Sequence, residues 1–323
     1  MKSIRSYKYR VYPNKAQINK LIIQNELLRT LYNCALEHRI YMYKKHNISI
    51  SLYDQQKELS EIIKDNSEYK SIHSQVLQNC LKRVDDAFQR FFQRCKSRKP
   101  NEKIGFPRFK KFNSYKSFTF PQSGFSFQQI KNRNYIRLSK IGDIKIKFHR
   151  NIDGKMKTCT LKKEPTGKYF IIFTAEVFNI PLEANLNCVG IDLNIKNYAT
   201  LSNGDVIDNP KFLKKEQKEL AKVQKKLSKT EKKSKEREHK KRVAARVNER
   251  IVNKRENFAH QESRKIVNKF HYIFFENLSI DRMIENNSEK REGSEYNKAI
   301  LDASWGKFIK YTESKAENAG REY

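Results

Sequence analysis

The sequence has no long hydrophobic run and no apolar leader. None of its apolar segments approaches the roughly 20 residues that a helix needs to cross a bilayer. The N-terminus, MKSIRSYKYRVYPN, lacks the apolar stretch of a secretory signal peptide. We therefore expect a cytoplasmic protein.

Paired cysteines are also missing. None of the five cysteines belongs to a C-x-x-C pair, so the sequence encodes no zinc ribbon and we expect no zinc. An odd number of thiols scattered through apolar segments fits reduced thiols in a core, in a reducing compartment. The cysteines are Cys34, Cys80, Cys95, Cys159 and Cys188.

Acidic residues are few. The 323 residues include 68 Lys and Arg against 36 Asp and Glu, which gives a net charge of +32. A charge of this size repels itself in the isolated protein, and binding a polyanion relieves the repulsion. Nucleic acid is the expected partner, and an anionic membrane surface is the rival.

The first hundred residues are mostly helical in pattern. Residues 2–12 alternate as one short strand, and Asn14 is a good N-cap for an amphipathic helix over about 15–46. Two further helical patterns cover about 54–64 and 72–96, and the second keeps one continuous apolar face. This region predicts a small helical domain.

The periodicity changes to two after a basic loop at 99–112. Residues 113–180 contain six alternating segments separated by turn residues, which predicts a β-rich, barrel-like module. The strand at 2–12 would complete that module, so the helical domain would be an insertion between its first and second strands.

From residue 186 the pattern is α/β. The Asn203-Gly204 dipeptide lies between apolar runs and predicts a hairpin turn. A helical pair at about 211–270 follows, then a strand ending near Glu276. The remainder reads as a polar loop at 281–297 and a last helix begun by ILDASWGKF, in which Trp305 is expected to pack in the core.

The helical pair is unusually basic. Between Lys211 and Arg255 there are 19 Lys and Arg but 6 Asp and Glu, too uneven for a face of balanced ion pairs. We expect this arm to grip phosphates without reading sequence. The expected contact residues are Lys225, Lys226, Lys240, Lys241, Arg242 and Arg246.

The loop GFPRFKKF interleaves aromatic and basic residues. Arg108, Lys110 and Lys111 could hold phosphates while the phenylalanines stack on bases. The alternative is that Phe106, Phe109 and Phe112 anchor the loop to a core, and both can hold together. His260 and His271 are expected to be ordinary core or surface imidazoles rather than metal ligands.

Two acids stand out among the apolar strands. Asp192 lies between Ile191 and Leu193, and Glu276 comes directly after an Ile-Phe-Phe run. A buried carboxylate costs several kcal/mol unless a cation compensates it. A neighbouring Lys or Arg is one compensation, and a divalent ion, Mg²⁺ or Mn²⁺, shared by the two acids is the other. We favour the metal site.

These motifs resemble the TnpB (OrfB) family of insertion-sequence proteins. The resemblance is carried by GIDLNIKNYATLSNGDVIDNPKFLKK, ERIVNKRENFAHQ, FFENLSI and ILDASWGKF, and by VYPNKAQ, KIGFPRFKK and KIGDIKIKFHR upstream. The motifs occur in the family's order and cover essentially the whole chain. Their combination is specific, although no single one is.

The resemblance implies a multidomain α+β and α/β fold for an RNA-guided DNA endonuclease. It implies a wedge-like β-barrel at 1–13 and 113–182, with a helical recognition domain at 14–112 inserted in it. A RuvC-like (RNase H-like) nuclease domain would occupy 186–323, with its basic helical arm at 211–270.

The resemblance also implies partners and site residues. The partners would be a guide RNA from the transposon end and double-stranded target DNA with a short flanking motif. Asp192 and Glu276 would be the first two catalytic acids, and Tyr53 and Gln78 would contact the flanking motif. The host would be bacterial or archaeal and the protein nucleoid-associated.

Two departures from the family pattern matter. The family continues with another strand, a four-cysteine zinc ribbon and a third catalytic Asp, all absent here, so we expect a C-terminally truncated protein that binds RNA and DNA but cleaves poorly. Asn194 also stands where the family usually has Gly.

Three alternatives stay open. The chain could be an active nuclease that uses Asp302 or Glu322, or a part supplied in trans, as its third acid. It could be a nuclease-dead, RNA-guided DNA-binding repressor. It could also be a basic RNA-binding protein with no DNA role.

Overall fold

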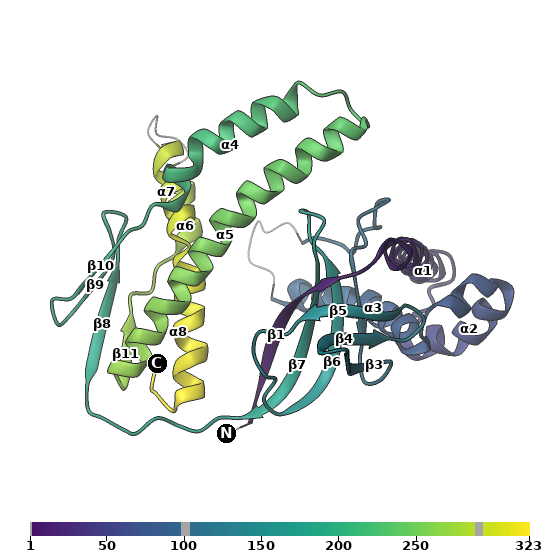
Figure 1. Ribbon diagram of the computed structural model, residues 1–323, viewed down its shortest axis with the longest axis horizontal. Helices are drawn as coiled ribbons and strands as arrows, with labels where there is room; N and C mark the ends of the chain where they lie inside the picture. The colour runs from purple at the N-terminus through teal and green to yellow at the C-terminus, as the bar shows by residue number, and fades with distance from the viewer. Residues whose placement is uncertain (1, 98–103, 288–292) are drawn as a thin grey trace. The chain divides into compact units, whose positions relative to one another are not determined.

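The computed structural model describes residues 2–97, 104–287 and 293–323, and the chain divides into two compact units (Figure 1). We call Ile4–Val177 the N-terminal unit, and Phe178–Tyr323 together with Met1–Ser3 the C-terminal unit. The first part of the predicted basic loop, 99–103, lies outside the described residues. In the described parts of the chain, no helix is both long and apolar enough to cross a membrane.

The N-terminal unit consists of one sheet and the helices that follow its first strand. Its helices are α1 (Lys15–His46), α2 (Leu52–Asp65), the short 3₁₀ helix η1 (Ser67–Ser71) and α3 (Ser74–Lys96). Its strands are β1 (Lys2–Tyr12), β2 (Ser117–Phe120), β3 (Phe125–Ile130), β4 (Arg133–Leu138), β5 (Gly142–Lys147), β6 (Lys155–Lys163) and β7 (Tyr169–Phe178).

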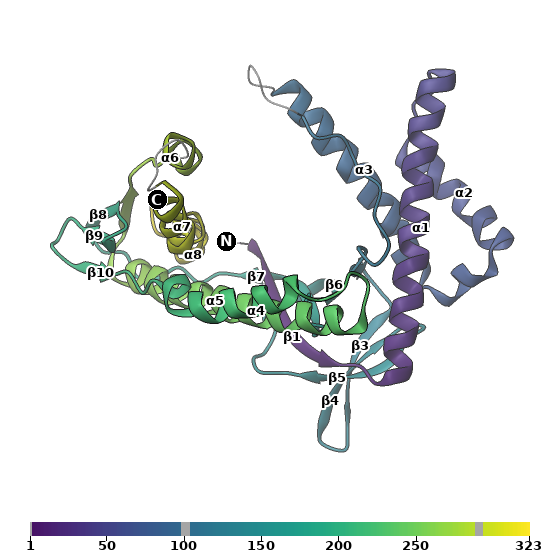
Figure 2. The ribbon, with the colours of Figure 1, turned by 90° about the horizontal axis from the view of Figure 1, so that it is seen from above.

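The seven strands form a single curled sheet in the order β2-β6-β7-β1-β5-β4-β3 (Figure 2). β1 lies in the middle of this order, between β7 and β5, although the helices separate it from the other strands in the chain. The predicted insertion of helices between the first and second strands is therefore confirmed. The alternating burial of β7 shows one face turned to the core, with Ile171 and Phe173 fully buried.

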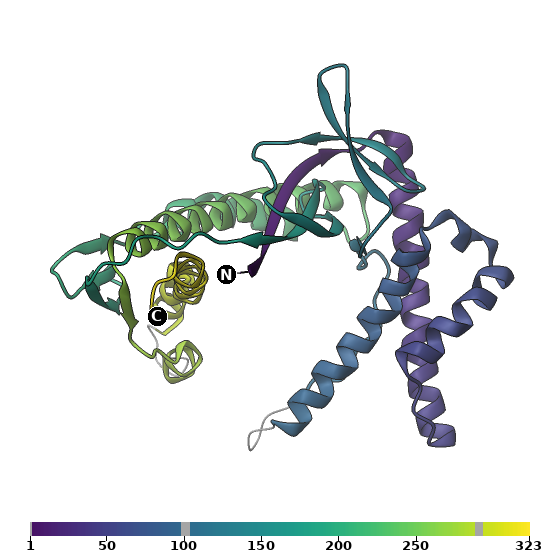
Figure 3. The ribbon, with the colours of Figure 1, turned by 90° about the horizontal axis from the view of Figure 1, so that it is seen from below.

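The helices begin where the sequence signals predict. Asn14 and Gln17 form a capping box, in which the Asn14 side chain accepts from the Gln17 N–H at 2.9 Å and the Gln17 side chain accepts from the Asn14 N–H at 2.9 Å. α1 and α3 lie side by side (Figure 3) and bury Leu28 and Leu77 in the same core. This packing is what makes the helices and the sheet one unit.

The C-terminal unit contains a four-stranded sheet, a helical arm and a terminal group of helices. Its strands are β8 (Cys188–Leu193), β9 (Asn197–Leu201), β10 (Val206–Asp208) and β11 (Tyr272–Phe275). Its helices are α4 (Phe212–Ser228), α5 (Lys235–Lys269), α6 (Ile280–Asn287), α7 (Gly293–Ala303) and α8 (Trp305–Ala319).

The strands of this sheet are ordered β10-β9-β8-β11. β8, β9 and β10 are antiparallel neighbours, with the Asn203-Gly204 turn between β9 and β10 as predicted, and β11 joins β8 in parallel. α5 and α8 pack together, and Val267 and Phe308 from them share a core with Val189 of β8. Trp305 is 1% exposed in this core, which confirms the expected packing.

The helical arm is a hairpin of α4 against α5 (Figure 1). Arg250 of α5 contacts Glu216 at 3.1 Å and Glu219 at 2.8 Å, and Lys254 contacts Glu216 at 2.7 Å. The second half of the polar stretch 228–242 begins α5, because Ser234 caps that helix by accepting from the Arg237 N–H at 3.0 Å.

Two predictions near the C-terminal end are wrong. The polar loop expected at 281–297 is largely replaced by α6 and the start of α7, and residues 288–292 lie outside the described chain. Met283 and Ile284 pack against the core, which supplies the apolar contact that the polar composition concealed. The single last helix is two helices, because Ser304 adopts φ 55° and separates α7 from α8.

The cysteines also correct an expectation. All five are free thiols, but Cys34, Cys95 and Cys188 are exposed rather than in the core. Cys80 and Cys159 are buried, and burial raises the pKa of the Cys80 thiol to about 11. The apolar neighbours of the exposed three in sequence were a poor guide, because helix and strand faces separate adjacent residues.

Candidate functional site

The two acids predicted to share a metal lie on neighbouring strands. β11 pairs in parallel with β8, and its last described pair is Phe275 opposite Ile191. The Glu276 N–H donates to the Ile191 carbonyl at 3.4 Å, a hydrogen bond of that same pair, and Glu276 is the first residue after β11. Glu276 therefore follows Phe275 at the position where Asp192 follows Ile191.

Strand alternation places Asp192 on one face of the sheet, and the same alternation carried one residue past β11 places Glu276 on that face. Ile191 and Leu193 are buried toward the helices, so the intervening Asp192 points to the opposite, open face. Phe274, two residues before Glu276, is 60% exposed on β11. Neighbouring strands lie about 4.8 Å apart, which brings carboxylates at matching positions within reach of a shared ion.

The burial expected for these acids is wrong. Both Asp192 and Glu276 are exposed. The apolar neighbours that suggested burial point to the other face, as the period of a strand dictates. Among the described residues neither carboxylate is joined to a Lys or Arg, although the chain carries 68 such residues. The compensation by a neighbouring cation that was the rival to a metal is therefore not observed.

Asn194 and Thr200 complete the surroundings of Asp192. Thr200 of β9 is the strand partner of Asp192. The Asn194 amide nitrogen lies 3.4 Å from both an Asp192 carboxylate oxygen and the Thr200 hydroxyl. The Asn194 side-chain oxygen accepts from the Asn197 N–H at 2.8 Å, which holds the amide in place. Asn194 is thus placed to orient the Asp192 carboxylate.

No third acid joins the pair in the part of the chain that the structure describes, where no group of three or more His, Cys, Asp or Glu could hold a metal. Asp302, one alternative candidate, is fully engaged elsewhere. It accepts from the Arg255 Nε at 2.8 Å and from the Leu213 N–H at 2.9 Å, at the base of the arm.

Glu322, the other candidate, lies beside the start of β11. It forms a parallel bridge with Tyr272, and its N–H donates to the His271 carbonyl at 2.9 Å. Tyr272 precedes Glu276 by four residues, a span of about 13 Å along a strand. Glu322 therefore sits at the opposite end of β11 from the acid pair.

His260 and His271, which were expected to be ordinary imidazoles, each contact a neighbouring side chain. His260 stacks on Tyr311 with ring centroids 3.9 Å apart. The His271 Nδ1 lies 3.1 Å from an Arg321 guanidinium nitrogen.

The arm presents its predicted contact residues at its surface. Lys241 pairs with Glu238 at 2.7 Å and Lys240 approaches Glu236 at 3.7 Å. The other predicted contacts have no acidic partner among the described residues, and they are Lys225, Lys226, Arg242 and Arg246. Their charge is available to a polyanion.

The aromatic loop divides between anchoring and exposure. Phe106 meets Phe91 and Phe88 edge-on, with centroid distances of 5.1 and 5.7 Å, so it anchors the loop to α3. Phe109 and Phe112 are 53% and 72% exposed and stay free to stack on bases. The basic residues between them, Arg108, Lys110 and Lys111, are also exposed.

Tyr53 and Gln78 are both exposed, on α2 and α3 of the N-terminal unit. Lys57 lies over the Tyr53 ring at 4.6 Å. Sequence reasoning missed Arg90 and Lys116, which line a hollow together with Lys110. In the sequence, Arg90 and Lys116 are single basic residues, and such residues are too common in this chain to be singled out.

Comparison with known proteins gives consistent relatives. A family model described as "Probable transposase" matches residues 170–287, and one described as "Helix-turn-helix domain" matches residues 1–47. The latter description does not fit the structure, in which these residues form β1 and one uninterrupted helix, α1.

Two curated relatives share 28% identity with the chain. One, from Streptomyces pristinaespiralis, is named a putative RNA-guided DNA endonuclease, and the match covers 98% of this chain and 76% of the relative. The other, from Escherichia coli (strain K12), is named putative RNA-guided DNA endonuclease InsQ, and the match covers 73% of this chain and 58% of the relative.

A solved structure shows a similar fold. It is a Cas12f1–sgRNA–target DNA complex determined by cryo-electron microscopy, similar with a TM-score of 0.51 and 11% identity over 95% of this chain and 72% of that one. The likeness supports the fold expected from sequence: helices inserted in a curled half-barrel sheet, followed by an RNase H-like unit.

Proposed function

Because this chain belongs to the TnpB (OrfB) family of insertion-sequence proteins, we propose that it binds a guide RNA and uses it to find double-stranded DNA. Asp192 and Glu276 are the two carboxylates that would hold Mg²⁺ or Mn²⁺ for phosphodiester cleavage. Their matching positions on the paired strands β8 and β11 are the observation that carries this proposal.

The residues present fit a divalent ion. Both acids are exposed, neither is joined to a Lys or Arg among the described residues, and hard divalent ions prefer carboxylate oxygens. A bound ion supplies polarisation of a phosphoryl oxygen and a hydroxide nucleophile at neutral pH. Asn194 would orient the Asp192 carboxylate. The helical arm, which belongs to the same C-terminal unit as the two acids, would hold the phosphate backbone.

We further propose that this polypeptide cleaves poorly on its own. Two-ion phosphodiester cleavage usually needs a third carboxylate, and the described residues bring none beside the pair. Asp302 is committed to Arg255, so the reading in which it completes the site has no support. Tight, guide-dependent DNA binding with weak cleavage is the expected behaviour, which suits a repressor.

The domain assignment is part of the proposal. The sheet would act as the wedge, residues 1–13 and 113–182, and the inserted helices, 14–112, would recognise the flanking DNA motif through Tyr53 and Gln78. Residues 186–323 would form the nuclease domain. Exposure of Tyr53, at 64%, supports a role in contact rather than in packing.

The test uses the purified protein with its co-purified RNA, a matched duplex carrying the flanking motif, and Mg²⁺ or Mn²⁺. We expect retention of matched DNA only, with little cutting, and no change in retention for Asp192→Ala. Asp208→Ala is the matched control, because Asp208 is an exposed Asp of the same sheet.

Two results would overturn the proposal in different parts. Fast double-strand cutting that Asp192→Ala abolishes and Asp208→Ala preserves would reject impaired cleavage while keeping the metal site. Protection of RNA without guide-dependent retention of DNA would reject DNA targeting and select a simple RNA-binding protein.

A further inference from the structure

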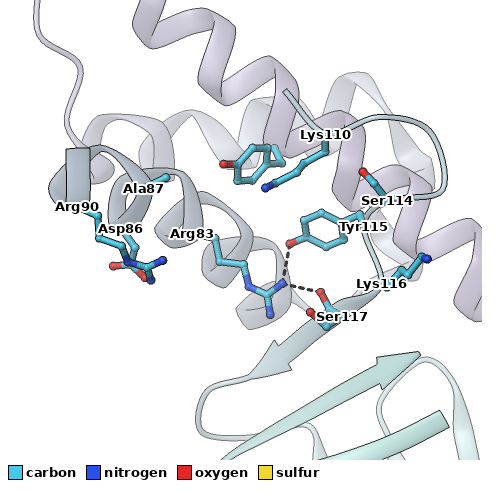
Figure 4. Close-up of a pocket in the computed structure, with 10 residues that line it drawn as sticks. Arg83, Asp86, Ala87, Arg90, Lys110, Ser114, Tyr115, Lys116 and Ser117 are labelled. Carbon is cyan, nitrogen blue, oxygen red and sulfur yellow. Dashed lines mark hydrogen bonds between the residues drawn. The ribbon is translucent and has the colours of Figure 1, made fainter. Parts of the chain in front are cut away.

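The N-terminal unit contains a basic hollow between α1, α3 and the segment that leads into β2 (Figure 4). It has a volume of about 440 Å³, within the range of ligand-sized pockets. We call it the α1–α3 hollow. It is lined by Tyr32, Arg83, Asp86, Ala87, Arg90, Lys110, Ser114, Tyr115, Lys116 and Ser117.

The floor of the hollow is held rigidly by Arg83. Its guanidinium donates to the Tyr115 hydroxyl at 3.2 Å and to the Ser117 carbonyl at 2.5 Å (Figure 4). It also donates to the Thr119 hydroxyl at 3.0 Å. Burial raises the pKa of Tyr115 well above its ordinary value, so its hydroxyl stays protonated. The hydrogen-bond donors of Arg83 are thus used in internal contacts, whereas its positive charge is not neutralised by these neutral partners.

The rim carries cations that are not engaged in this way. Arg90, Lys110 and Lys116 are all exposed, and none pairs with an acid in the parts of the chain that are described. Asp86 is the acidic residue among those lining the hollow, and it lies 3.4 Å from Lys82. The rim therefore has an uncompensated positive charge.

The position of Lys110 is fixed by the backbone around it. The Lys110 N–H donates to the Asn33 side chain at 2.8 Å, and the Asn33 amide donates back to the Lys110 carbonyl at 3.0 Å. The Lys110 ammonium lies over the Tyr32 ring, 5.1 Å from its centroid. Pinning reduces the entropy that the loop would lose on binding an anion.

We propose that the α1–α3 hollow binds a phosphodiester group of the nucleic-acid strand that this protein carries. Cations from α3 and from the 110–117 segment line it, so its charge suits an anionic group. A stacked base does not fit as well, because Tyr32 and Tyr115 are 4% and 7% exposed and Lys110 covers one ring. This inference deepens the proposed function and rests on it.

The hollow should add affinity without sequence preference, because phosphate contacts carry little base information. Guide RNA and target DNA share this chemistry, so the source of the phosphate is an outcome of the experiment. Of the rim residues, Lys110 was already a predicted contact. Arg90 and Lys116 are new, and the fold brings them together with it.

The test compares a rim variant, Arg90→Ala/Lys110→Ala/Lys116→Ala, with a control variant of equal charge. The control is Lys44→Ala/Lys45→Ala/Lys64→Ala, which removes three exposed lysines of α1 and α2 outside the hollow. Affinity is measured for single-stranded RNA and for duplex DNA over a series of salt concentrations, with thermal melting as the check on folding.

We expect the rim variant to bind about tenfold more weakly at physiological salt. Its plot of log affinity against log salt should be shallower by about 1–2, which corresponds to the loss of one or two phosphate contacts. Loss on RNA alone assigns the hollow to the guide, and loss on DNA alone assigns it to the target; either supports the proposal.

Equal slopes of log affinity against log salt for the rim and control variants would overturn the proposed phosphate site, while leaving the proposal of guide-directed binding intact. If the unaltered protein binds neither RNA nor DNA, both the proposed function and the proposed phosphate site are contradicted. A rim variant in which Lys110→Arg replaces Lys110→Ala should recover part of the slope, because the charge returns.

Discussion

Carboxylates occur both at one edge of the four-stranded sheet, where Asp192 and Glu276 lie, and at the base of the helical arm, where Asp302 lies. The two places differ in whether a protein cation neutralises the carboxylate. At the sheet edge, Asp192 and Glu276 lie exposed, with no Lys or Arg joined to them among the described residues. At the arm base, Asp302 is 10% exposed and is neutralised by Arg255 at 2.8 Å.

This difference separates structure from function. In a chain with a net charge of +32, Lys and Arg side chains are abundant, so most carboxylates can find a cationic partner. In the described part of the chain the two edge acids have no such partner, so they are available to an added cation. Asp302 accepts Arg255 and the Leu213 N–H, so it fastens α7 to the arm.

The largest expected effect is loss of metal binding at the sheet edge. Asp192→Asn/Glu276→Gln should weaken Mn²⁺ binding by more than about a hundredfold, since even the outer hydrogen-bond partners of a metal are worth 10–100-fold. Titration followed by the electron paramagnetic resonance of free Mn²⁺ measures it. Asp208→Asn is the control. Equal Mn²⁺ affinities for the two variants would contradict a metal site at Asp192 and Glu276.

The second effect is on stability, at the arm base. Asp302→Ala should lower the free energy of unfolding of the C-terminal unit by about 3 kcal/mol, because Arg255 is left half-buried without its partner. Trp305 is the sole tryptophan and is buried in this unit, so urea unfolding followed by its fluorescence reports on it.

The same variant sharpens the comparison, because Asp302→Ala should leave Mn²⁺ affinity unchanged. Asp302→Asn should be milder, since the amide oxygen still accepts from Arg255. A loss of metal affinity in Asp302→Ala, with stability intact, would instead place this acid in the metal site.

The smallest effect concerns a crowded cation of the same unit. Burial, followed by repulsion from Arg264, lowers the pKa of Lys315 to about 8. Protonation therefore costs more in the folded than in the unfolded state, whose lysines titrate near 10.4. The contribution of Lys315 to stability should accordingly rise between about pH 8 and pH 10.4.

The measurement is the melting temperature of the unaltered protein and of Lys315→Gln against pH. The variant should gain relative stability below pH 8, and the gain should shrink as the pH rises toward 10.4. Because Lys315 is only partly buried and donates to the His260 carbonyl at 2.6 Å, the difference should be modest. A gap that is constant with pH would show that Lys315 keeps an ordinary pKa.

Much of the fold could be predicted because its signals are local. The strand at Lys2–Tyr12, the capping box at Asn14 and the period-two segments after residue 113 were all read correctly. The predictions of a loop at 281–297 and of a single last helix were wrong because tertiary contacts decide the structure at α6 and at the break between α7 and α8. Met283 packs although its neighbours are polar, and Ser304 takes a left-handed conformation that no residue preference announces.

The sequence by itself nominated Asp192 and Glu276 as metal ligands, because each acid adjoins an apolar strand segment and lies in a family motif. It also predicted nucleic acid as the partner class, through an excess of Lys and Arg whose mutual repulsion a polyanion relieves. Tertiary structure alone decided that these acids face outward at matching positions and that Asp302 is bound to Arg255. It alone gathered Arg90, Lys110 and Lys116 around one hollow, because pairing register and helix packing join residues that the chain holds far apart.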